Sequence, residues 1–160
     1  MSGIKFKYNQ RSMPSAEATM DQMKAKTEQV RKDLNNATGF YARVAVLLDQ
    51  WVQRNFKSQG GNVGNWVPFK AGGRLVKGGG LDMSAQLLQD TGRLRASFLP
   101  FHTQNNAGIG SDLDYAELHN DGLGNLPERR MLPQRIDVMD KVNKLGKKHL
   151  VEVLDKKVTR

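Results

Sequence analysis

The feature that most constrains the fold is a regular row of apolar and small residues near the start of the chain. After Pro14 there is no proline and only one glycine, Gly39, as far as Lys57. Positions along the row alternate in steps of three and four, which is typical of a helix that packs along another helix. The sequence therefore predicts a long helix over residues 14–57, on the order of 60 Å in length at 1.5 Å per residue. The row consists of Met20, Met23, Thr27, Val30, Leu34, Ala37, Tyr41, Val44, Leu48 and Trp51.

The two halves of this row differ in character. After Gly39 the apolar face is dense and is widened by Phe40, Val46, Leu47 and Val52, so we expect this half to pack on the domain. Before Asn35 the row is sparse, and we interpret it as an oligomerisation arm that contacts a neighbouring subunit. Residues 35–39 form helix poorly and predict a kink or break. A helical hairpin with its turn at these residues is the alternative. The expected contact positions of the arm are Met20, Met23, Val30 and Leu34.

Length and composition limit the class of protein. A chain of 160 residues suits one domain with a projecting arm. It has no cysteine, which excludes disulfides, thiolate metal sites and cysteine nucleophiles. No apolar run approaches the ~18 residues of a membrane helix, and residues 1–13 lack the apolar core of a signal peptide. We interpret residues 1–13, which are polar and without periodicity, as a flexible tail or a strand that orders on a partner.

The formal net charge of +9 favours contact with nucleic acid or with an acidic protein surface. Basic residues are densest near the C-terminus, but no block of five like charges occurs. A basic protein that contacts DNA without sequence specificity is therefore the alternative function.

Residues 58–160 predict an α+β domain. A glycine-rich turn at 58–64 leads to a short apolar run, and a basic glycine-rich loop at 71–80, with Arg74 and Lys77, is expected to be mobile. This loop lacks the P-loop pattern, so no nucleotide site is expected. The further elements are a helical turn at 82–89, a strand at 94–103 and its return at 109–111, a short helix at 114–120, an extended segment at 126–133 and a helix at 135–158.

The fold class expected from these elements is α+β, with the long N-terminal helix and the C-terminal helix flanking a small antiparallel sheet. The apolar positions of the C-terminal helix are Ile136, Met139, Val142, Leu145, Leu150, Val153 and Leu154.

No group of residues builds a convincing catalytic, cofactor or metal site. His119 has Glu117 and Asp121 nearby, but residues two apart on a helix point to different faces. We therefore expect a surface or sheet-packing histidine, with a hydrolase as a minor alternative. His102 is expected to be a cross-strand neighbour, and no serine lies in a nucleophile elbow.

Four arginines could contact either phosphate or acidic residues of a neighbouring subunit, and we favour the protein partner. They are Arg93, Arg95, Arg129 and Arg130.

Five motifs between residues 55 and 132 follow one another in a specific order. Asn55-Phe56 precedes a glycine turn and Trp66-Val67-Pro68, and the basic loop follows. Residues 87–97 (LLQDTGRLRAS) are similar to L-x-x-T-G-x-L-x-x-S. Residues 109–111 (IGS) and 115–122 (YAELHNDG) are similar to V-G-[ST] and Y-A-x-x-H-x-x-G. Residues 126–132 (LPERRML) are similar to P-x-R-x-F-L, with Met131 in place of the usual phenylalanine.

Together these motifs, which cover about half of the chain, resemble the virion-morphogenesis family of tailed phages, the tail-completion and neck proteins of long-tailed, Mu-like phages. The N-terminal helix does not align with the family pattern. The resemblance implies a non-enzymatic structural protein of the virion, at the neck or tail top, that assembles in the host cytoplasm. It also implies a homo-oligomeric ring, a hexamer or dodecamer, that contacts other neck and tail proteins and no membrane. Within such a particle, the alternative is a basic protein that contacts DNA on the genome exit path or in capsid morphogenesis.

The motifs also have a physical interpretation. Gly92 permits a tight switch from helix to strand, and Leu94 is expected to start that strand facing inward. Tyr115 and Leu118 are expected to be buried together, with Glu117 and His119 outside. Gly122 is expected to end the short helix with a positive φ. The residues expected to define the fold are Trp66, Gly92, Leu94, Tyr115, Gly122 and Leu132.

Overall fold

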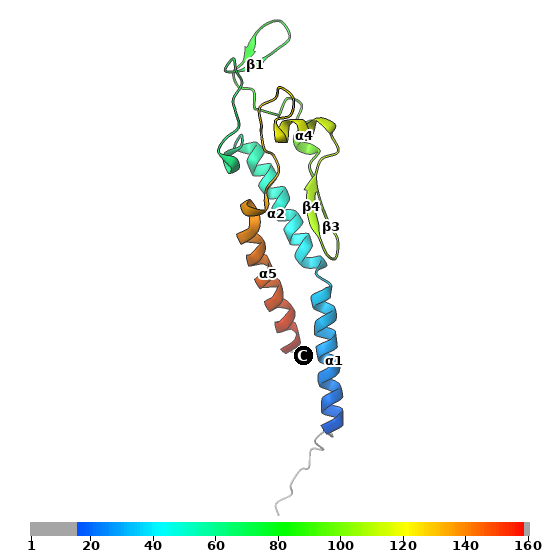
Figure 1. Ribbon diagram of the computed structural model, residues 1–160. Helices are drawn as coiled ribbons and strands as arrows, with labels where there is room; N and C mark the ends of the chain where they lie inside the picture. The colour runs from blue at the N-terminus through cyan, green and yellow to red at the C-terminus, as the bar shows by residue number, and fades with distance from the viewer. Residues whose placement is uncertain (1–15, 159–160) are drawn as a thin grey trace, which may run out of the picture.

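The computed structural model describes residues 16–158 and shows an elongated molecule with a compact region at one end (Figure 1). The predicted α+β class is confirmed, with a long helical N-terminal part, a C-terminal helix and two small antiparallel sheets rather than one. The predicted tail over residues 1–13 lies outside the described residues. The elements are α1 (Ala16–Asn35), α2 (Thr38–Lys57), η1 (Gly61–Val63), β1 (Arg74–Leu75), β2 (Leu81–Asp82), α3 (Arg93–Ala96), β3 (Leu99–His102), β4 (Ala107–Gly110), α4 (Asp114–Asp121) and α5 (Arg135–Val158).

A short break separates α1 from α2, as residues 35–39 indicated. The Asn36 side-chain oxygen accepts hydrogen bonds of 2.6 Å from the Thr38 hydroxyl and 3.4 Å from its main-chain nitrogen. Such a local side-chain bond competes with the helical pattern and interrupts it. The chain nevertheless continues in nearly the same direction, so the helical-hairpin alternative is wrong (Figure 1).

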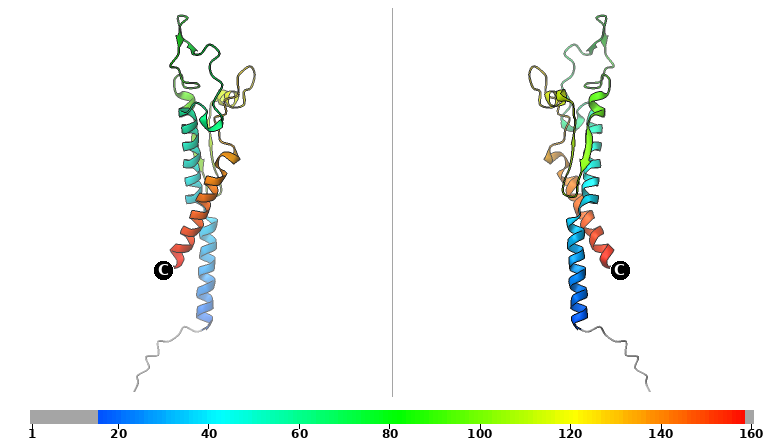
Figure 2. Two further views of the ribbon diagram at one scale, coloured as in Figure 1. Left: turned by 90° about the vertical axis from the view of Figure 1, so that its left-hand side faces the viewer. Right: turned by 90° about the vertical axis from the view of Figure 1, so that its right-hand side faces the viewer.

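Helix α2 is the central element of the compact region. It contacts α5 on one side and the β3–β4 hairpin on another, while α1 continues beyond the end of α5 (Figure 2). Val44, Trp51 and Val52 of the predicted dense face are buried, but Val46 is 55% exposed. The core joins residues of α2 to those of the later segments. Its buried members are Trp51, Val52, Phe56, Trp66, Leu87, Leu94, Phe98, Ala116, Met131 and Val138.

The predicted strand at 94–103 begins later than expected. Gly92 has a φ of +72°, as its place at a switch indicated, but a helical turn, α3, follows it and holds the buried Leu94. The Ser97 hydroxyl donates to the Leu94 carbonyl at 2.7 Å, a bond that suits the end of a helical turn. The strand proper begins at Leu99, and β3 pairs with β4 in antiparallel register.

The β3–β4 hairpin has a covered face and an open face. Ile109 packs against the core, and its cross-strand partner Pro100 projects from the same face but is exposed. Leu99 and Phe101 therefore lie on the opposite face, and they are 68% and 55% exposed. A Cβ on Gly108 would meet the Phe101 ring at 2.4 Å, so this ring lies directly on the opposing strand.

The basic glycine-rich loop is a projecting hairpin. Arg74 and Leu75 pair with Asp82 and Leu81 in a two-residue ladder. The helical turn predicted at 82–89 is wrong, because this segment is β2 followed by turns. The Asp82 carboxylate accepts bonds from the hydroxyl and main-chain nitrogen of Ser84 at 2.7 and 3.0 Å, which stabilises a turn instead of a helix.

Helix α5 is present over the predicted range, and its apolar positions are covered unequally. Val138 is buried, whereas Ile136 is 83% exposed and Leu150 and Leu154 are about half exposed. Met139, Val142, Leu145 and Val153 are partly buried. The packed face includes polar residues, since Arg43 of α2 bonds Glu152 at 2.9 Å and His149 at 3.2 Å.

Helix α4 also faces the core differently from the prediction. Its buried residue is Ala116, while Tyr115 and Leu118 are 38% and 42% exposed. Gly122 ends the helix with a φ of +67°, as predicted. No helix within residues 16–158 is long and apolar enough to cross a membrane.

Candidate functional site

The extended segment between α4 and α5 is the point where the distant parts of the chain meet. The main-chain carbonyl of Arg130 accepts two hydrogen bonds, from the Asn55 amide at 2.8 Å and from the Trp66 indole at 3.0 Å. Asn55 is fully buried, and Trp66 is 5% exposed. Both Asn55 and Trp66 therefore fix the same peptide unit from separate parts of the chain.

Arg129 holds the other side of this segment. Its Nε and Nη2 atoms donate to the Val67 carbonyl at 3.1 and 2.9 Å, and its main-chain nitrogen donates to the His119 carbonyl at 2.9 Å. The side chain is only 9% exposed, and this burial lowers the pKa of its guanidinium. The prediction that Arg129 lies on the surface for a neighbouring subunit is wrong, because its guanidinium is used within the chain.

Asn120 completes this bonded cluster. The Asn120 side-chain oxygen accepts from the main-chain nitrogens of Met131 and Leu132 at 2.8 and 3.1 Å. We call this set the motif hub: Asn55, Trp66, Asn120, Arg129 and Arg130. Separately, the hydroxyls of Ser97 and Ser111 lie 2.6 Å apart and join the end of α3 to the end of β4.

Other predicted contact arginines also have partners within the chain. Arg130 binds Asp137 at 2.6 Å, and both side chains are less than a fifth exposed. Asp137 also accepts a 2.7 Å bond from the main-chain nitrogen of Gln134, so it organises the start of α5. Arg95 donates to Gln53 at 2.7 Å and so joins α3 to α2.

The basic hairpin has one internally paired cation and one exposed cation. Arg74 contacts Asp90 and lies 3.8 Å from Asp82. Lys77, at the hairpin tip, is exposed, as is Arg93 at the start of α3. Of the predicted basic contacts, Lys77 and Arg93 are therefore the most accessible to another molecule.

The histidine candidate does not form a hydrolytic site with its neighbouring carboxylates. His119 and Glu117 line different clefts, as their spacing predicted. His119 is half-buried rather than on the surface, and within the described residues its Nδ1 has no hydrogen-bond partner. Burial, and then the positive charge of Arg129, lowers the pKa of His119 below its ordinary value. The imidazole is thereby favoured in its neutral form.

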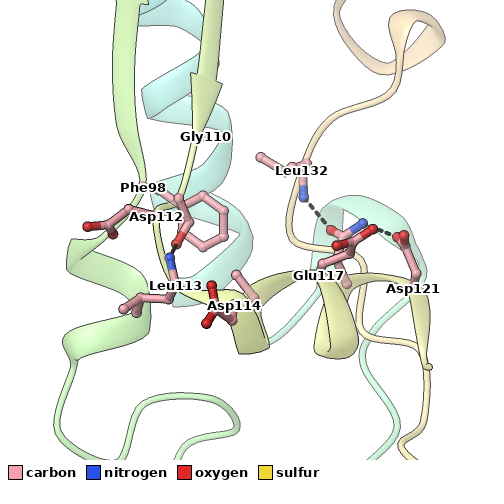
Figure 3. Close-up of a pocket in the computed structure, with 11 residues that line it drawn as sticks. Phe98, Gly110, Asp112, Leu113, Asp114, Glu117, Asp121 and Leu132 are labelled. Atoms are coloured by element: carbon pink, nitrogen blue, oxygen red, sulfur yellow. Dashed lines mark hydrogen bonds between the residues drawn. The ribbon is translucent and has the colours of Figure 1, made fainter. Parts of the chain in front are cut away.

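An open acidic cleft lies between the end of β4 and α4 (Figure 3). Its volume is about 420 Å³, and Phe98, Leu113 and Leu132 contribute apolar surface. None of its lining residues is basic. Over residues 16–158, no three carboxylate or histidine side chains are grouped closely enough to hold a metal ion. The carboxylates around the cleft belong to Asp112, Asp114, Glu117 and Asp121.

No role was predicted for Asn55 and Asn120, although both lie within the quoted motifs. A buried amide is usually hydrogen-bonded, but the local sequence does not show that Asn55 is buried. No protein-family model, curated protein or solved structure matches this chain.

Proposed function

We propose that this chain is a structural subunit of a tailed-phage particle that completes the tail and helps to join it to the head. The subunit forms a homo-oligomeric ring, a hexamer or dodecamer, at the neck or tail top after assembly in the host cytoplasm. Its mechanism is assembly through apolar anchors and matched charges, without catalysis.

The observation that carries this proposal is the motif hub. The motifs that resemble the tail-completion family are spread over residues 55–132, and they include Asn55, Trp66, Asn120 and Arg129. In the fold these residues bond one another's segments. A motif set that encodes one connected bonding pattern is stronger support for kinship than five short motifs taken separately.

The apolar surface that the chain leaves open also supports an assembly role. On α1, Met20 and Met23 are 57% and 63% exposed, and Leu34 is 39% exposed, while Val30 is partly covered. On the projecting β1–β2 hairpin, Leu75 is 72% exposed. Exposed apolar groups of this kind mark protein contacts, and contacts between different surfaces of identical subunits generate rings.

Imaging of the assembled particle tests the proposal. We expect ring-shaped density for this chain at the head–tail junction or tail top, and separate heads and tails when the chain is missing. Intact, infectious particles without this chain would refute a role in tail completion.

Removal of the arm is a narrower test. A chain that lacks residues 1–34 keeps α2 and the motif hub, and we expect it to fold but to fail in ring formation. Normal rings from this truncated chain would show that the arm is not an inter-subunit contact.

The second candidate is a protein that contacts DNA without sequence specificity. It is favoured by one side of α5, on which Lys141, Lys144, Lys147 and Lys148 are all exposed. Such a protein binds unrelated duplexes with an affinity that falls steeply as salt rises. Absence of binding at low ionic strength would remove this candidate and leave the structural role.

A further inference from the structure

The open face of the β3–β4 hairpin is an exposed apolar surface on which no other element of the described chain packs. Leu99 and Phe101 lie on it side by side, and their opposing residues Gly110 and Gly108 have no side chains that could cover them. Helix α2 and the core cover only the other face. A two-stranded sheet that is apolar on both faces gains stability when a further layer covers the second face.

The same surface continues into the acidic cleft. Gly110 belongs to β4 and also lines the cleft, so the apolar face and the cleft meet at this residue. The segment after β4 contributes three carboxylates to the cleft, those of Asp112, Asp114 and Glu117. A partner that covers both parts needs apolar side chains together with positive charge, and an extended segment matches the length of a strand.

The N-terminal residues of this chain have that chemistry. Apolar or aromatic side chains occur at Ile4, Phe6 and Tyr8, with Lys5 and Lys7 between them. This alternation covers only five residues, so residues 1–13 as a whole have no periodicity. Arg11 follows, and no acidic residue occurs before Glu17. In an extended conformation the three apolar side chains lie on one side of the segment and the lysines on the other.

The lengths of the elements decide whose hairpin this segment can cover. The hairpin packs on α2, and its turn lies beside the start of α2 (Figures 1 and 2). Helix α1 has 20 residues and leads away from that point for about 30 Å. Residues 9–15 span at most about 25 Å when fully extended. Tyr8 therefore falls short of the hairpin turn of its own chain, so Ile4, Phe6 and Tyr8 cannot all lie along that hairpin.

We propose that residues 4–11 of one copy dock on the open face of the β3–β4 hairpin and the acidic cleft of a neighbouring copy. Ile4, Phe6 and Tyr8 cover Leu99 and Phe101, and Arg11, which follows the alternating residues, lies near the cleft carboxylates. Donor and acceptor are different surfaces, so each copy gives one segment and receives another, which suits a closed ring. This inference rests on the proposed function, because it names the contact that links the subunits of the ring.

Disulfide cross-linking tests the contact directly, because the chain has no cysteine of its own. We expect Phe6→Cys mixed with Leu99→Cys to give a cross-linked dimer on oxidation. The double variant should give a ladder of higher species that ends at the ring. Phe101→Cys is a second acceptor position, and Lys57→Cys, on the exposed end of α2, is the matched control that should not cross-link to Phe6→Cys.

A charge variant tests the cleft. Asp112→Asn with Glu117→Gln keeps the size of both side chains, and we expect roughly tenfold weaker cross-linking through Phe6→Cys because attraction to the segment is lost. Unchanged cross-linking would remove the acidic cleft from the docking surface.

Two results would overturn the inference as a whole. One is a double variant that cross-links only within its own chain, and the other is a ring that forms without any contact between residues 6 and 99. In the second case the proposed function would stand, since the ring would use other surfaces. Conversely, the protein could form the expected cross-links and yet be absent from phage particles. That result would support the contact and refute the proposed function.

Discussion

The side-chain amide of Asn55 donates a hydrogen bond of 2.8 Å to the main-chain carbonyl of Arg130, 75 residues further along the chain. The Trp66 indole donates to the same carbonyl at 3.0 Å. Asn55 lies near the end of α2, and Arg130 lies in the segment that leads to α5, so this carbonyl connects the central helix to the last helix of the fold. Neither bond is visible in the local pattern of the sequence.

Asn55→Ala is expected to lower the free energy of unfolding by about 1–3 kcal/mol, because a buried hydrogen bond and its packing are lost. Asn55→Asp should cost more, since a carboxylate at this fully buried position would face the Arg130 carbonyl without a donor. Urea denaturation measures both. Gln50→Ala, on the exposed side of α2, is the control and should stay within about 0.5 kcal/mol of the original protein. Equal losses at positions 50 and 55 would contradict this role.

Arg129→Lys tests whether the guanidinium is held by its geometry or only by its charge. The two bonds from Nε and Nη2 to the Val67 carbonyl require the planar guanidinium, which an ammonium group cannot reproduce. We expect a loss of about 1–3 kcal/mol in thermal or urea unfolding. Arg93→Lys changes an exposed arginine in the same way and should have little effect. If Arg129→Lys left the free energy of unfolding unchanged, the planar guanidinium would not be needed at this position.

The stability of the fold should depend on pH through His119. Burial and the charge of Arg129 lower the pKa of His119 in the folded chain, whereas the unfolded imidazole takes up a proton near pH 6.5. Below that pH the unfolded chain binds more protons, so stability falls as pH drops through 6.5 toward the lower folded pKa. His119→Gln, which does not titrate, should flatten this part of the curve of unfolding free energy against pH. An identical slope in both proteins would contradict the assignment.

The sequence predicted those parts of the fold that depend on local pattern. The two long helices follow from helical periodicity, and the positive φ of Gly92 and Gly122 follows from glycine at the ends of short elements. The break between α1 and α2 was also indicated by weak helix formers. Each of these features is decided within a few residues of the chain.

The features that the sequence missed depend on contacts between distant segments. Arg129 reads as a surface charge between two prolines, yet its partner is the Val67 carbonyl, 62 residues away. Tyr115 and Leu118 have the spacing of a buried pair, but α4 packs through the small Ala116. On α5 the helical period is correct, but Ile136 and Leu154 are exposed while Glu152 bonds Arg43 of α2. Periodicity determines the spacing of a face but not which neighbour covers it.

Substitutions at Gly122 and Gly124 allow the cost of backbone conformation to be measured separately from the cost of steric crowding. Their φ angles are +67° and +68°, so alanine is strained equally at both positions. A Cβ on Gly122 would lie 2.6 Å from the Glu128 nitrogen and 2.8 Å from its Cα, whereas a Cβ on Gly124 would meet nothing within 4 Å. We therefore expect Gly124→Ala to cost about 1–2 kcal/mol in urea unfolding, from conformation alone.

Gly122→Ala should cost about 2–5 kcal/mol, because the added methyl group must also push back the main chain at Glu128. That displacement would reach the next residue, Arg129, and through it the bonds to the Val67 carbonyl. The variant should therefore show faster amide exchange at Arg129, whose nitrogen bonds the His119 carbonyl, and Gly124→Ala should not. Equal costs for the two substitutions would mean that the chain at Glu128 yields freely, and that the close approach at Gly122 does not hold the motif hub together.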